Sequence, residues 1–450
     1  MSEGDTTSAV PTPEEVVQGC KDILDKNKHG GYTIPADGLY PHQWLWDSCF
    51  IAIGLAEYDL ERAKNELTNL LRGQWANGML PHMIFDETNS GKRDKNIWQS
   101  WRSIYAPDNV HTSGLTQPPM LAEAVVRIGQ KMKMVDRRAW YQDMYPALVS
   151  YHSWLYNERD PHNEGLILLL HPWESGLDNS PPWIDQLHQH SRPWWVNVID
   201  TLKLDKIALF LRRDTKHVPP GQRLDSIDAL LYFALLQRFK RKHWDTDRIL
   251  EHSTFSFQDL TYNSIFIRAN THLQDIAKTI GRDIPEDLQT NMDKSEEALE
   301  MLWDGFYKQY YSRTFITHKL VKEPSIATLM PLYAGTISKE RAEELVRILN
   351  SPSQFATNYP IPSVPVTSNY YKELGYWQGP TWINTNWLVA DGLERYGYKD
   401  EATTIRKSSI ALVTKHGPYE YFSAKNGDPA GAKNFSWSAA LTIHMIKETS

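Results

Sequence analysis

Cysteine is almost missing from this sequence, which has only Cys20 and Cys49 among its 450 residues. Both stand among apolar neighbours in segments that we expect to be helical. Two cysteines cannot build the disulfide framework of a small secreted domain, and their scarcity fits a reducing compartment. Residues 1–5 are polar and acidic, unlike the start of a secretory signal. We therefore expect a cytoplasmic protein.

Long apolar runs and blocks of basic charge are missing as well. The densest apolar run, residues 50–56, is far shorter than the roughly 18 residues that a membrane-spanning helix needs. Lys and Arg number 48 against 55 Asp and Glu, a formal net charge of −7, and no stretch concentrates the basic residues. Because nucleic acids and anionic membranes bind basic patches, we expect neither as a partner. A homo-oligomer is compatible with the sequence.

The common cofactor and metal motifs do not occur. The sequence has no glycine-rich phosphate loop, no dinucleotide-binding glycine run, no His-Glu-x-x-His pair and no Gly-x-Ser-x-Gly elbow. His171, His188 and His190 are close in sequence, but neither cysteines nor suitably spaced carboxylates accompany them, so we interpret them as loop histidines. We expect neither a metal nor an organic cofactor.

Helical periodicity, in contrast, dominates the chain. Residues 12–15 form a capping box with proline at the first helical position, which predicts a helix ending near residue 26. Many of the helices are joined by only a few residues, as in antiparallel hairpins. No linker divides the chain, so we expect one all-α domain over residues 1–450, built from about six hairpins, with a minor β-hairpin that pairs residues 307–311 with 314–319. The other expected helices cover about 47–57, 59–73, 117–134, 137–158, 223–243, 257–280, 286–304, 324–335, 338–349, 383–397, 399–415 and 435–448.

Four long segments between these helices are expected to be non-helical. They cover about 77–116, 159–222, 350–382 and 416–434. Long loops in a compact domain usually build a functional site. These segments also contain many of the 17 tryptophans, beside Gly, Pro and Asn, where no regular element requires a tryptophan. We therefore expect the functional site in these loops.

Two of the aromatic motifs could form a wall for a sugar. Residues 40–47 read Tyr-Pro-His-Gln-Trp-Leu-Trp-Asp, and residues 376–382 read Tyr-Trp-Gln-Gly-Pro-Thr-Trp. Asp47 can be a helix N-cap. It can equally belong to a sugar site, because aromatic faces bind the C–H surface of a pyranose while a carboxylate accepts hydroxyl hydrogens. The residues alone leave both interpretations open.

Two further motifs place carboxylates among aromatic rings. Residues 173–181 read Trp-Glu-Ser-Gly-Leu-Asp-Asn-Ser-Pro, and Glu420 stands in Pro-Tyr-Glu-Tyr-Phe at residues 418–422. Apolar surroundings raise the pKa of a carboxyl and are typical of functional acids. Cleavage of a glycosidic bond needs one proton donor and one base or nucleophile, so two remote carboxylates in aromatic loops indicate that reaction. Spacing does not choose between Glu174, Asp178 and Asp185 as the donor.

Taken together, these motifs resemble those of the mannosylglycerate and glucosylglycerate hydrolases of glycoside hydrolase family 63, which are related to trehalases and to processing mannosyl-oligosaccharide glucosidases. The match extends in family order from Tyr40 to Trp437, nearly the whole chain. The resemblance implies an (α/α)6 barrel and an inverting mechanism without a cofactor. It implies that Asp178, in Glu-Ser-Gly-x-Asp, is the general acid. It also implies that Glu420, ahead of a Ser-Trp pair, is the general base.

The resemblance further implies a set of substrate-binding residues. Arg223 corresponds to the basic residue that holds the glycerate carboxylate. Pro182 and Gln378 stand where arginine is usual, and Phe435 stands where the glucosylglycerate enzymes carry glutamine. We expect these three departures around the pocket mouth, with an altered acceptor subsite. The implied sugar-binding residues are Tyr40, Trp44, Trp46, Asp47, Gln117, Trp173, Gly176, Tyr376, Trp377, Trp382 and Trp437.

The expected function is therefore that of an inverting α-glycosidase acting on a small α-glycoside, with mannosylglycerate or glucosylglycerate as substrate and water as co-substrate. One alternative is an α-glucosidase for an oligosaccharide or a disaccharide, similar to the processing glucosidases or to trehalase. A second alternative, from another class, is a catalytically idle sugar-binding protein on the same barrel. A lyase would need a Tyr, His and Arg site in place of two carboxylates.

Overall fold

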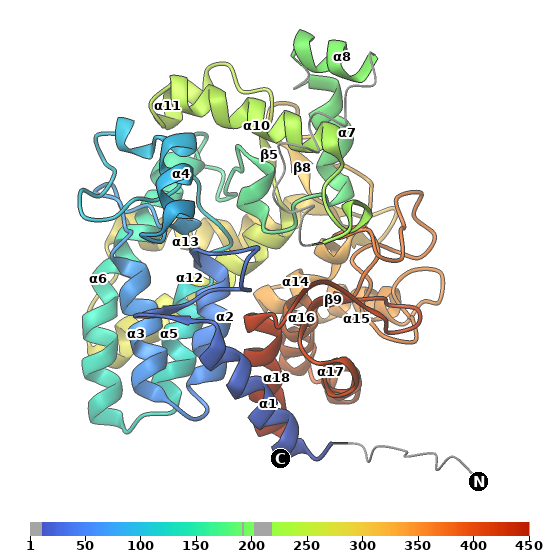
Figure 1. The fold of residues 1–450 in the computed structure, drawn as a ribbon. Helices are drawn as coiled ribbons and strands as arrows, with labels where there is room; N and C mark the ends of the chain where they lie inside the picture. Colours follow the sequence, from blue (N-terminus) through green and yellow to red (C-terminus); the bar gives the residue numbers. More distant parts are fainter. Residues whose placement is uncertain (1–10, 191–192, 202–217, 450) are drawn as a thin grey trace.

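The computed structural model describes residues 11–190, 193–201 and 218–449, and these are mostly helical (Figure 1). The long connections contain α4 (Asn89–Trp98), α7 (Pro181–His190), α8 (Trp194–Thr201), α10 (Ser226–Arg241) and α11 (Thr246–Leu250). None of the described helices is both long and apolar enough to cross a membrane. The remaining helices are α1 (Pro13–Lys26), α2 (Leu45–Leu55), α3 (Leu60–Leu71), α5 (Leu121–Gln130), α6 (Met134–Arg159), α12 (Leu260–Ile280), α13 (Glu286–Ala298), α14 (Pro331–Ala334), α15 (Lys339–Leu349), α16 (Ile383–Arg395), α17 (Lys399–His416) and α18 (Ser436–Thr449).

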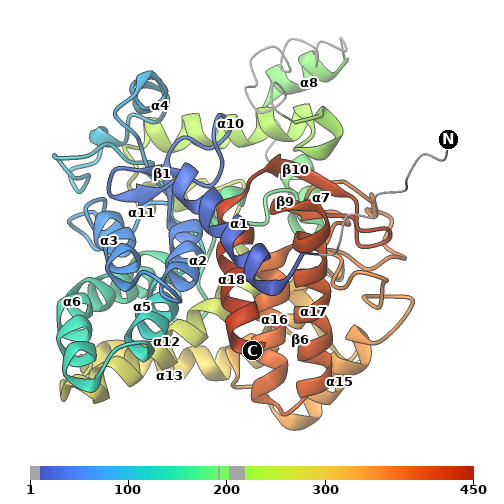
Figure 2. The same cartoon turned by 60° about the horizontal axis from the view of Figure 1, so that its bottom comes forward.

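Six inner helices form a closed ring. Helix α2 packs on α5, α5 on α12, α12 on α14, α14 on α16, α16 on α18, and α18 returns to α2. Helices α1, α3, α6, α13, α15 and α17 alternate with them along the chain and lie outside the ring; Figure 2 shows α18 between α2 and α16. The protein is an (α/α)6 barrel, as the sequence predicts.

Burial follows this division between inner and outer helices. Every residue of the inner helix α2 is buried, and a Cβ on Gly54 would lie 2.3 Å from the backbone oxygen of Ala440, so only glycine allows α2 and α18 to approach this closely. The outer helix α3 instead buries one face, made by Ala63, Leu67, Leu70 and the polar Glu66. The sequence of α2 is therefore a nearly continuous apolar run, whereas that of α3 is a periodic pattern.

The ring brings the N-terminal ends of the inner helices together. An outer helix runs back between each successive pair of inner ones, so the inner helices all point the same way. Trp44 is the N-cap of α2, Trp382 is the N-cap of α16, and Ser436 begins α18. Motifs separated by hundreds of residues in the sequence consequently meet at one end of the barrel.

Most predicted helix boundaries hold to within about four residues, but two predictions are wrong. The helix expected over 324–335 is a 3₁₀ turn (Ile326–Leu329) followed by the four-residue α14, and the helix expected over 286–304 ends at Ala298, before a second 3₁₀ turn (Leu299–Leu302). The capping box at Thr12 and Glu15 is present as expected. The helix expected over 117–134 begins only at Leu121, after Pro118 and Pro119. The expectation that 77–116 and 159–222 are non-helical is wrong, because α4, α7 and α8 lie there. Residues 191–192 and 202–217 of the second segment lie outside the described residues.

The predicted β-hairpin is also wrong in its pairing. The strands are short and antiparallel: β6 (Trp303–Asp304) pairs with β7 (Gln309–Tyr310), whereas β8 (Arg313–Thr314) pairs with β5 (Phe257–Gln258). The Asp304 carboxylate accepts the backbone N–H groups of the next turn and closes the hairpin earlier than expected. The other pairs are β1 (Lys28–His29) with β2 (Tyr32–Thr33), β3 (Gln43–Trp44) with β4 (Met83–Ile84), and β9 (Tyr419–Phe422) with β10 (Pro429–Lys433).

Candidate active site

A cavity of about 280 Å³ lies at the end of the barrel where the inner helices begin. It contains every site residue that the sequence predicts, drawn from loops far apart in the chain. Leu39, Leu224 and Phe435 also line it. The predicted residues in its wall are Tyr40, Trp44, Trp46, Asp47, Gln117, Trp173, Gly176, Asp178, Arg223, Tyr376, Trp377, Trp382, Glu420 and Trp437.

Stacked and crossed indole rings build one wall of this cavity. Trp377 and Trp382 stack with ring centroids 3.6 Å apart and an angle of 4° between their planes. Trp437 meets Trp46 edge to face at 5.4 Å and lies 5.9 Å from Trp382. Gly176 has a φ of +71°, and a Cβ there would lie 2.7 Å from the Trp46 ring. The wall is therefore rigid, and the glycine is required beside it.

Glu420, on β9, is held by four hydrogen bonds. Its Oε1 accepts the hydroxyl of Tyr40 at 2.8 Å and Nη1 of Arg223 at 2.9 Å. Its Oε2 accepts Nη2 of Arg223 at 2.6 Å and the backbone N–H of Ala432 at 2.8 Å. Glu420 is only 2% exposed. These bonds fill the roughly four acceptor positions of a carboxylate and fix the side chain in place.

The loop that carries Arg223 is tied directly to this strand pair. The hydroxyl of Tyr421 donates to the backbone oxygen of Gln222 at 2.7 Å, and the N–H of Gly431 donates to the Gln222 side chain at 3.1 Å. Arg223 also lies over the rings of Tyr40 and Tyr376, 5.5 and 5.0 Å from their centroids. The guanidinium is therefore placed on Glu420 by several independent contacts.

Asp178 follows a short 3₁₀ turn, η2 (Pro172–Ser175), and has a different environment from Glu420. The pKa of its carboxyl is raised to about 7, mainly by burial; a hydrogen bond from Tyr376 and the charge of Arg223 oppose this rise, and the charge of Glu420 adds to it. The Tyr376 hydroxyl donates to Oδ2 at 3.1 Å. Tyr376 has a φ of +64°, a strained backbone of the kind often found at functional sites. Asp178 is thus protonated in a substantial fraction of molecules near neutral pH, unlike an ordinary aspartate.

Backbone contacts fix the loop that holds Asp178. Its carbonyl oxygen accepts the hydroxyl of Tyr232 and the indole N–H of Trp183, the latter at 3.2 Å. The side chain of Asn179 accepts the N–H of Trp377 at 2.8 Å, which joins this loop to the aromatic motif at residues 376–382. The position of Asp178 therefore depends on elements from three parts of the chain.

Asp47 is the third carboxyl of the cavity and is 4% exposed. Burial raises its pKa well above the usual value, and the charges of Glu420 and Asp178 act in the same direction. Asp47 lies in the first turn of α2, where the positive end of the helix dipole favours a carboxylate. Three carboxyls and one guanidinium thus share a small aromatic space.

The structure separates Asp178 from the two other acids that the sequence left open. Glu174 is fully buried and pairs with Arg159 at 2.8 Å, and it also accepts the backbone N–H of Leu170 at 2.8 Å. Asp185 accepts the hydroxyl of Tyr370 at 2.7 Å. Neither acid lines the cavity. Glu174 has a structural environment, and Asp178 is the acid that reaches the site.

Comparison with known proteins identifies the family. The model of the mannosylglycerate hydrolase MGH1-like glycoside hydrolase domain matches residues 40–438. The chain belongs to this family of glycoside hydrolases. It is 37% identical to mannosylglycerate hydrolase from Thermus thermophilus over 95% of this chain and 99% of that protein. It is 29% identical to glucosylglycerate hydrolase from Mycolicibacterium hassiacum over 97% and 98% of the two chains.

A solved structure agrees with this assignment. The crystal structure of a family 63 mannosylglycerate hydrolase from Thermus thermophilus, in complex with Tris and D-glycerate, superposes with a TM-score of 0.85. The identity is 35%, with 95% of this chain and 99% of that chain covered. This MGH1-like glycoside hydrolase is therefore an enzyme that acts on a small glycoside and water.

The three departures from the family pattern lie in different places in this hydrolase. Phe435 lines the cavity as expected and meets Tyr40 and Trp437 edge to face, at 5.8 and 4.8 Å between ring centroids. Gln378 instead donates to the backbone oxygen of Asn179 at 2.9 Å, and Pro182 lies in the first turn of α7. Neither lines the cavity, so placing them around its mouth was wrong. Their positions in the motifs could not show which side chains turn inward.

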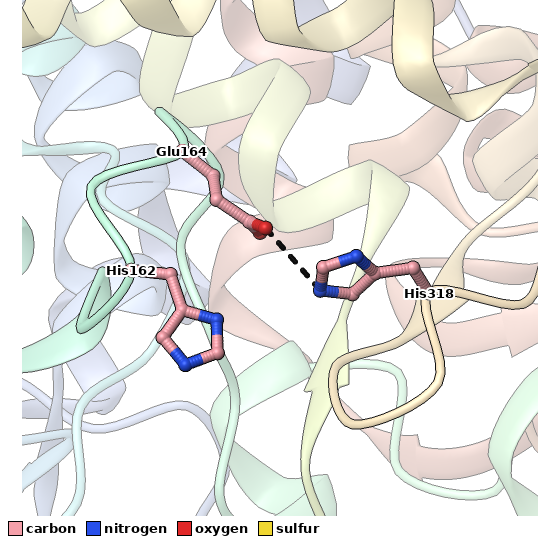
Figure 3. Close-up of side chains that lie close together, drawn as sticks. All are labelled: His162, Glu164 and His318. Carbon is pink, nitrogen blue, oxygen red and sulfur yellow. Dashed lines mark ion pairs between the residues drawn. The ribbon is translucent and has the colours of Figure 1, made fainter.

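Among the residues that the structure describes, one group of potential metal ligands lies outside the cavity of this hydrolase. His162, Glu164 and His318 bring donor atoms within 4.8 Å of one another, and Glu164 lies 3.2 Å from His318 (Figure 3). Arg313, however, pairs with the Glu164 carboxylate at 2.8 Å, and its positive charge opposes the binding of a metal cation there.

Two of the histidines that are close in sequence have other partners. His171 accepts the N–H of Trp173, and His188 pairs with Asp228 at 2.6 Å.

Proposed function

We propose that this glycoside hydrolase cleaves mannosylglycerate or glucosylglycerate with inversion at the anomeric carbon. One observation carries the proposal: Asp178, whose pKa is raised to about 7, and Glu420, which accepts two hydrogen bonds from Arg223, line the same aromatic cavity. An acid and a base with different environments are what inverting hydrolysis requires.

The sugar would occupy the space between the indole walls. Trp44 and Trp437 line the cavity, and the Nε1–H of each is buried without a hydrogen-bond partner in the described part of the chain. Sugar hydroxyls would satisfy both donors, and Asp47 would accept hydroxyl hydrogens. The apolar ring faces would bind the C–H surface of the pyranose.

Asp178 would act as the general acid. It transfers its proton to the glycosidic oxygen while the bond from that oxygen to the anomeric carbon breaks, so that glycerate leaves as a neutral alcohol at that position. Its pKa of about 7 suits this role, because the carboxyl is protonated at the start of the reaction and readily gives its proton up.

Glu420 would act as the general base. It accepts a proton from a water molecule that attacks the anomeric carbon from the face opposite the leaving group. All four acceptor positions of Glu420 are filled, two of them by Arg223, so the base must lose a contact before it can accept that proton. A glycerate carboxylate that binds Arg223 would draw the guanidinium away and free an oxygen of Glu420.

Release of sugar from a panel of substrates tests the proposal. Mannosylglycerate, glucosylglycerate, trehalose and an α-linked glucose oligosaccharide are incubated with the enzyme and with Asp178→Asn, and free sugar is measured. We expect turnover of at least one glycosylglycerate by the parent enzyme and almost none by the variant. Turnover of trehalose or the oligosaccharide alone would instead support the trehalase-like or glucosidase alternative.

We further propose that residues 1–450 act as one cytoplasmic domain. The ring closes only when α18 packs on α2, which supports a single unit, and the buried free thiols of Cys20 and Cys49 suit a reducing compartment. Limited proteolysis that releases a stable fragment would contradict the first statement, and cell fractionation tests the second. Light scattering decides between a monomer and a homo-oligomer.

A further inference from the structure

A second cavity adjoins the active-site cavity and is about twice as large. Its volume is about 570 Å³, against about 280 Å³ for the first. The two cavities share Trp44, Gln117, Trp173, Asp178 and Leu224. Because these side chains border both spaces, a molecule bound at Asp178 can extend from one cavity into the other.

The wall of the second cavity is mostly apolar. Ile97 and Trp98 come from α4, and Leu230, Phe233 and Leu236 come from α10. Phe233 is 43% exposed and lines this cavity together with its apolar neighbours. Exposed apolar side chains that face a cavity are typical of a ligand-binding surface.

Asp178 determines which part of a substrate meets this second cavity. The general acid protonates the leaving oxygen, so the leaving group lies on the far side of Asp178 from the sugar. The sugar occupies the smaller cavity with the Trp377 and Trp382 walls, neither of which reaches the second cavity. The leaving group is therefore directed past Asp178 toward Leu224 and the apolar walls.

Glycerate alone would use little of this space. It is a three-carbon acid with an oxygen on every carbon, and it offers no apolar surface to Leu230, Phe233 or Leu236. Arg93, Asp94 and Ser226 also line the cavity, with Asp94 bonded to His42 at 2.8 Å, but the walls from α4 and α10 are otherwise apolar, so a second sugar would place many of its hydroxyls against apolar side chains. An alkyl or aryl group, in contrast, matches the walls in chemistry and size.

We propose that the second cavity is a leaving-group subsite for an apolar aglycone, so that the enzyme also hydrolyses α-glycosides whose alkyl or aryl aglycone is larger than glycerate. This inference rests on the proposed function, since it assumes that Asp178 protonates the leaving oxygen. The aglycone displaces water from the apolar cavity. The free energy gained by burying its apolar surface stabilises the transition state and raises kcat/KM.

A series of alkyl glycosides measures the effect. The substrates are methyl, propyl and hexyl α-D-mannosides, the matching α-D-glucosides, and the two glycosylglycerates. We expect kcat/KM to rise with chain length in the series of the preferred sugar, by up to about fourfold for each methylene that the cavity buries. A constant kcat/KM from methyl to hexyl, in an enzyme that cleaves a glycosylglycerate, would overturn the inference and leave the proposed function intact.

A substitution that fills the second cavity with a larger side chain provides the structural test. Ala229 lines the second cavity from α10, and Ala234 lies on the same helix, also half-buried, outside that cavity. We expect Ala229→Phe to remove the preference for hexyl over methyl glycosides, whereas Ala234→Phe retains it. Equal effects of the two variants would place the alkyl group elsewhere and overturn the inference. Failure of the parent enzyme to cleave any substrate in the series would instead refute the proposed function.

Discussion

Arg223 binds both oxygens of the Glu420 carboxylate, Nη1 to Oε1 at 2.9 Å and Nη2 to Oε2 at 2.6 Å, in a buried pair whose side chains are 4% and 2% exposed. The sequence resemblance gives Arg223 a different partner, the carboxylate of glycerate. Glu420 takes only two of the five N–H groups of the guanidinium, and the Nε–H has no hydrogen-bond partner among the described residues, so a second carboxylate would bind the same guanidinium beside Glu420. Acceptor binding and the state of the base are therefore coupled through one side chain.

Replacement of Arg223 tests this coupling. In Arg223→Ala the buried Glu420 loses its cation, and a buried carboxylate without a cation takes up a proton more readily, which blocks its use as a base. We expect kcat to fall for mannosylglycerate and for methyl α-mannoside alike, with a rise in KM only for mannosylglycerate. Arg223→Lys keeps the charge and should be less affected. An unchanged kcat for the neutral glycoside would mean that Arg223 acts on the acceptor alone.

The two carboxyls should each be indispensable. Asp178→Asn cannot give a proton and Glu420→Gln cannot accept one, so each variant should lose about 10²–10⁴-fold in kcat. Asp185→Asn is the matched control, because it removes a nearby acid that lies outside the cavity. Circular dichroism and thermal unfolding would verify that the variants are folded. Near-complete activity in either active-site variant would exclude that residue from the mechanism.

The pKa of Asp178 sets the alkaline limb of the pH profile. The acid works only when protonated and its pKa is about 7, so kcat/KM should fall as the pH rises above about 7. The hydrogen bond from Tyr376 stabilises the charged form and lowers this pKa. Tyr376→Phe should therefore move the alkaline limb to higher pH. A limb that stays in place, or moves to lower pH, would contradict the assignment of Asp178 as the acid.

Gly431 gives a steric test of the position of Glu420. A Cβ at residue 431 would lie 2.6 Å from Oε2 and 2.8 Å from Cβ of Glu420. Gly431→Ala should displace the carboxylate and lower kcat at least about tenfold, since small displacements of catalytic groups have large effects on rate. Gly417→Ala is the control, because Gly417 has a similar φ of +81° and open space around it. Equal loss in both variants would indicate backbone strain only.

The sequence predicted the helical hairpins for a physical reason, whereas the set of cavity residues followed from the resemblance to the family motifs. Hydrophobic periodicity and short connections give the number and order of the helices. The motifs at Asp47, Trp382 and Trp437 directly adjoin helix starts, and the closed ring brings those starts together. Leu39 and Leu224 gave no signal, because an apolar residue in a loop has no distinctive chemistry.

Contacts between segments far apart in the chain could not be predicted from the sequence. The pairing of β8 with β5 joins residues 55 and 57 positions apart, and alternation within residues 307–319 indicates an extended backbone without indicating its partner. Helix α4 is polar and has no clear apolar stripe, so its sequence was interpreted as part of a loop. The same limitation hid the Arg223–Glu420 pair and the apolar cavity between α4 and α10.

The stereochemistry of the released sugar tests the central claim most directly. Proton NMR spectra are recorded in the first minutes of hydrolysis of mannosylglycerate and of glucosylglycerate, before the free sugar equilibrates between its anomers. If Asp178 is the acid and Glu420 the base that activates water, an α-glycoside must first give the β-anomer. Initial release of the α-anomer would contradict this account, because it would require a covalent intermediate formed on one of the carboxylates.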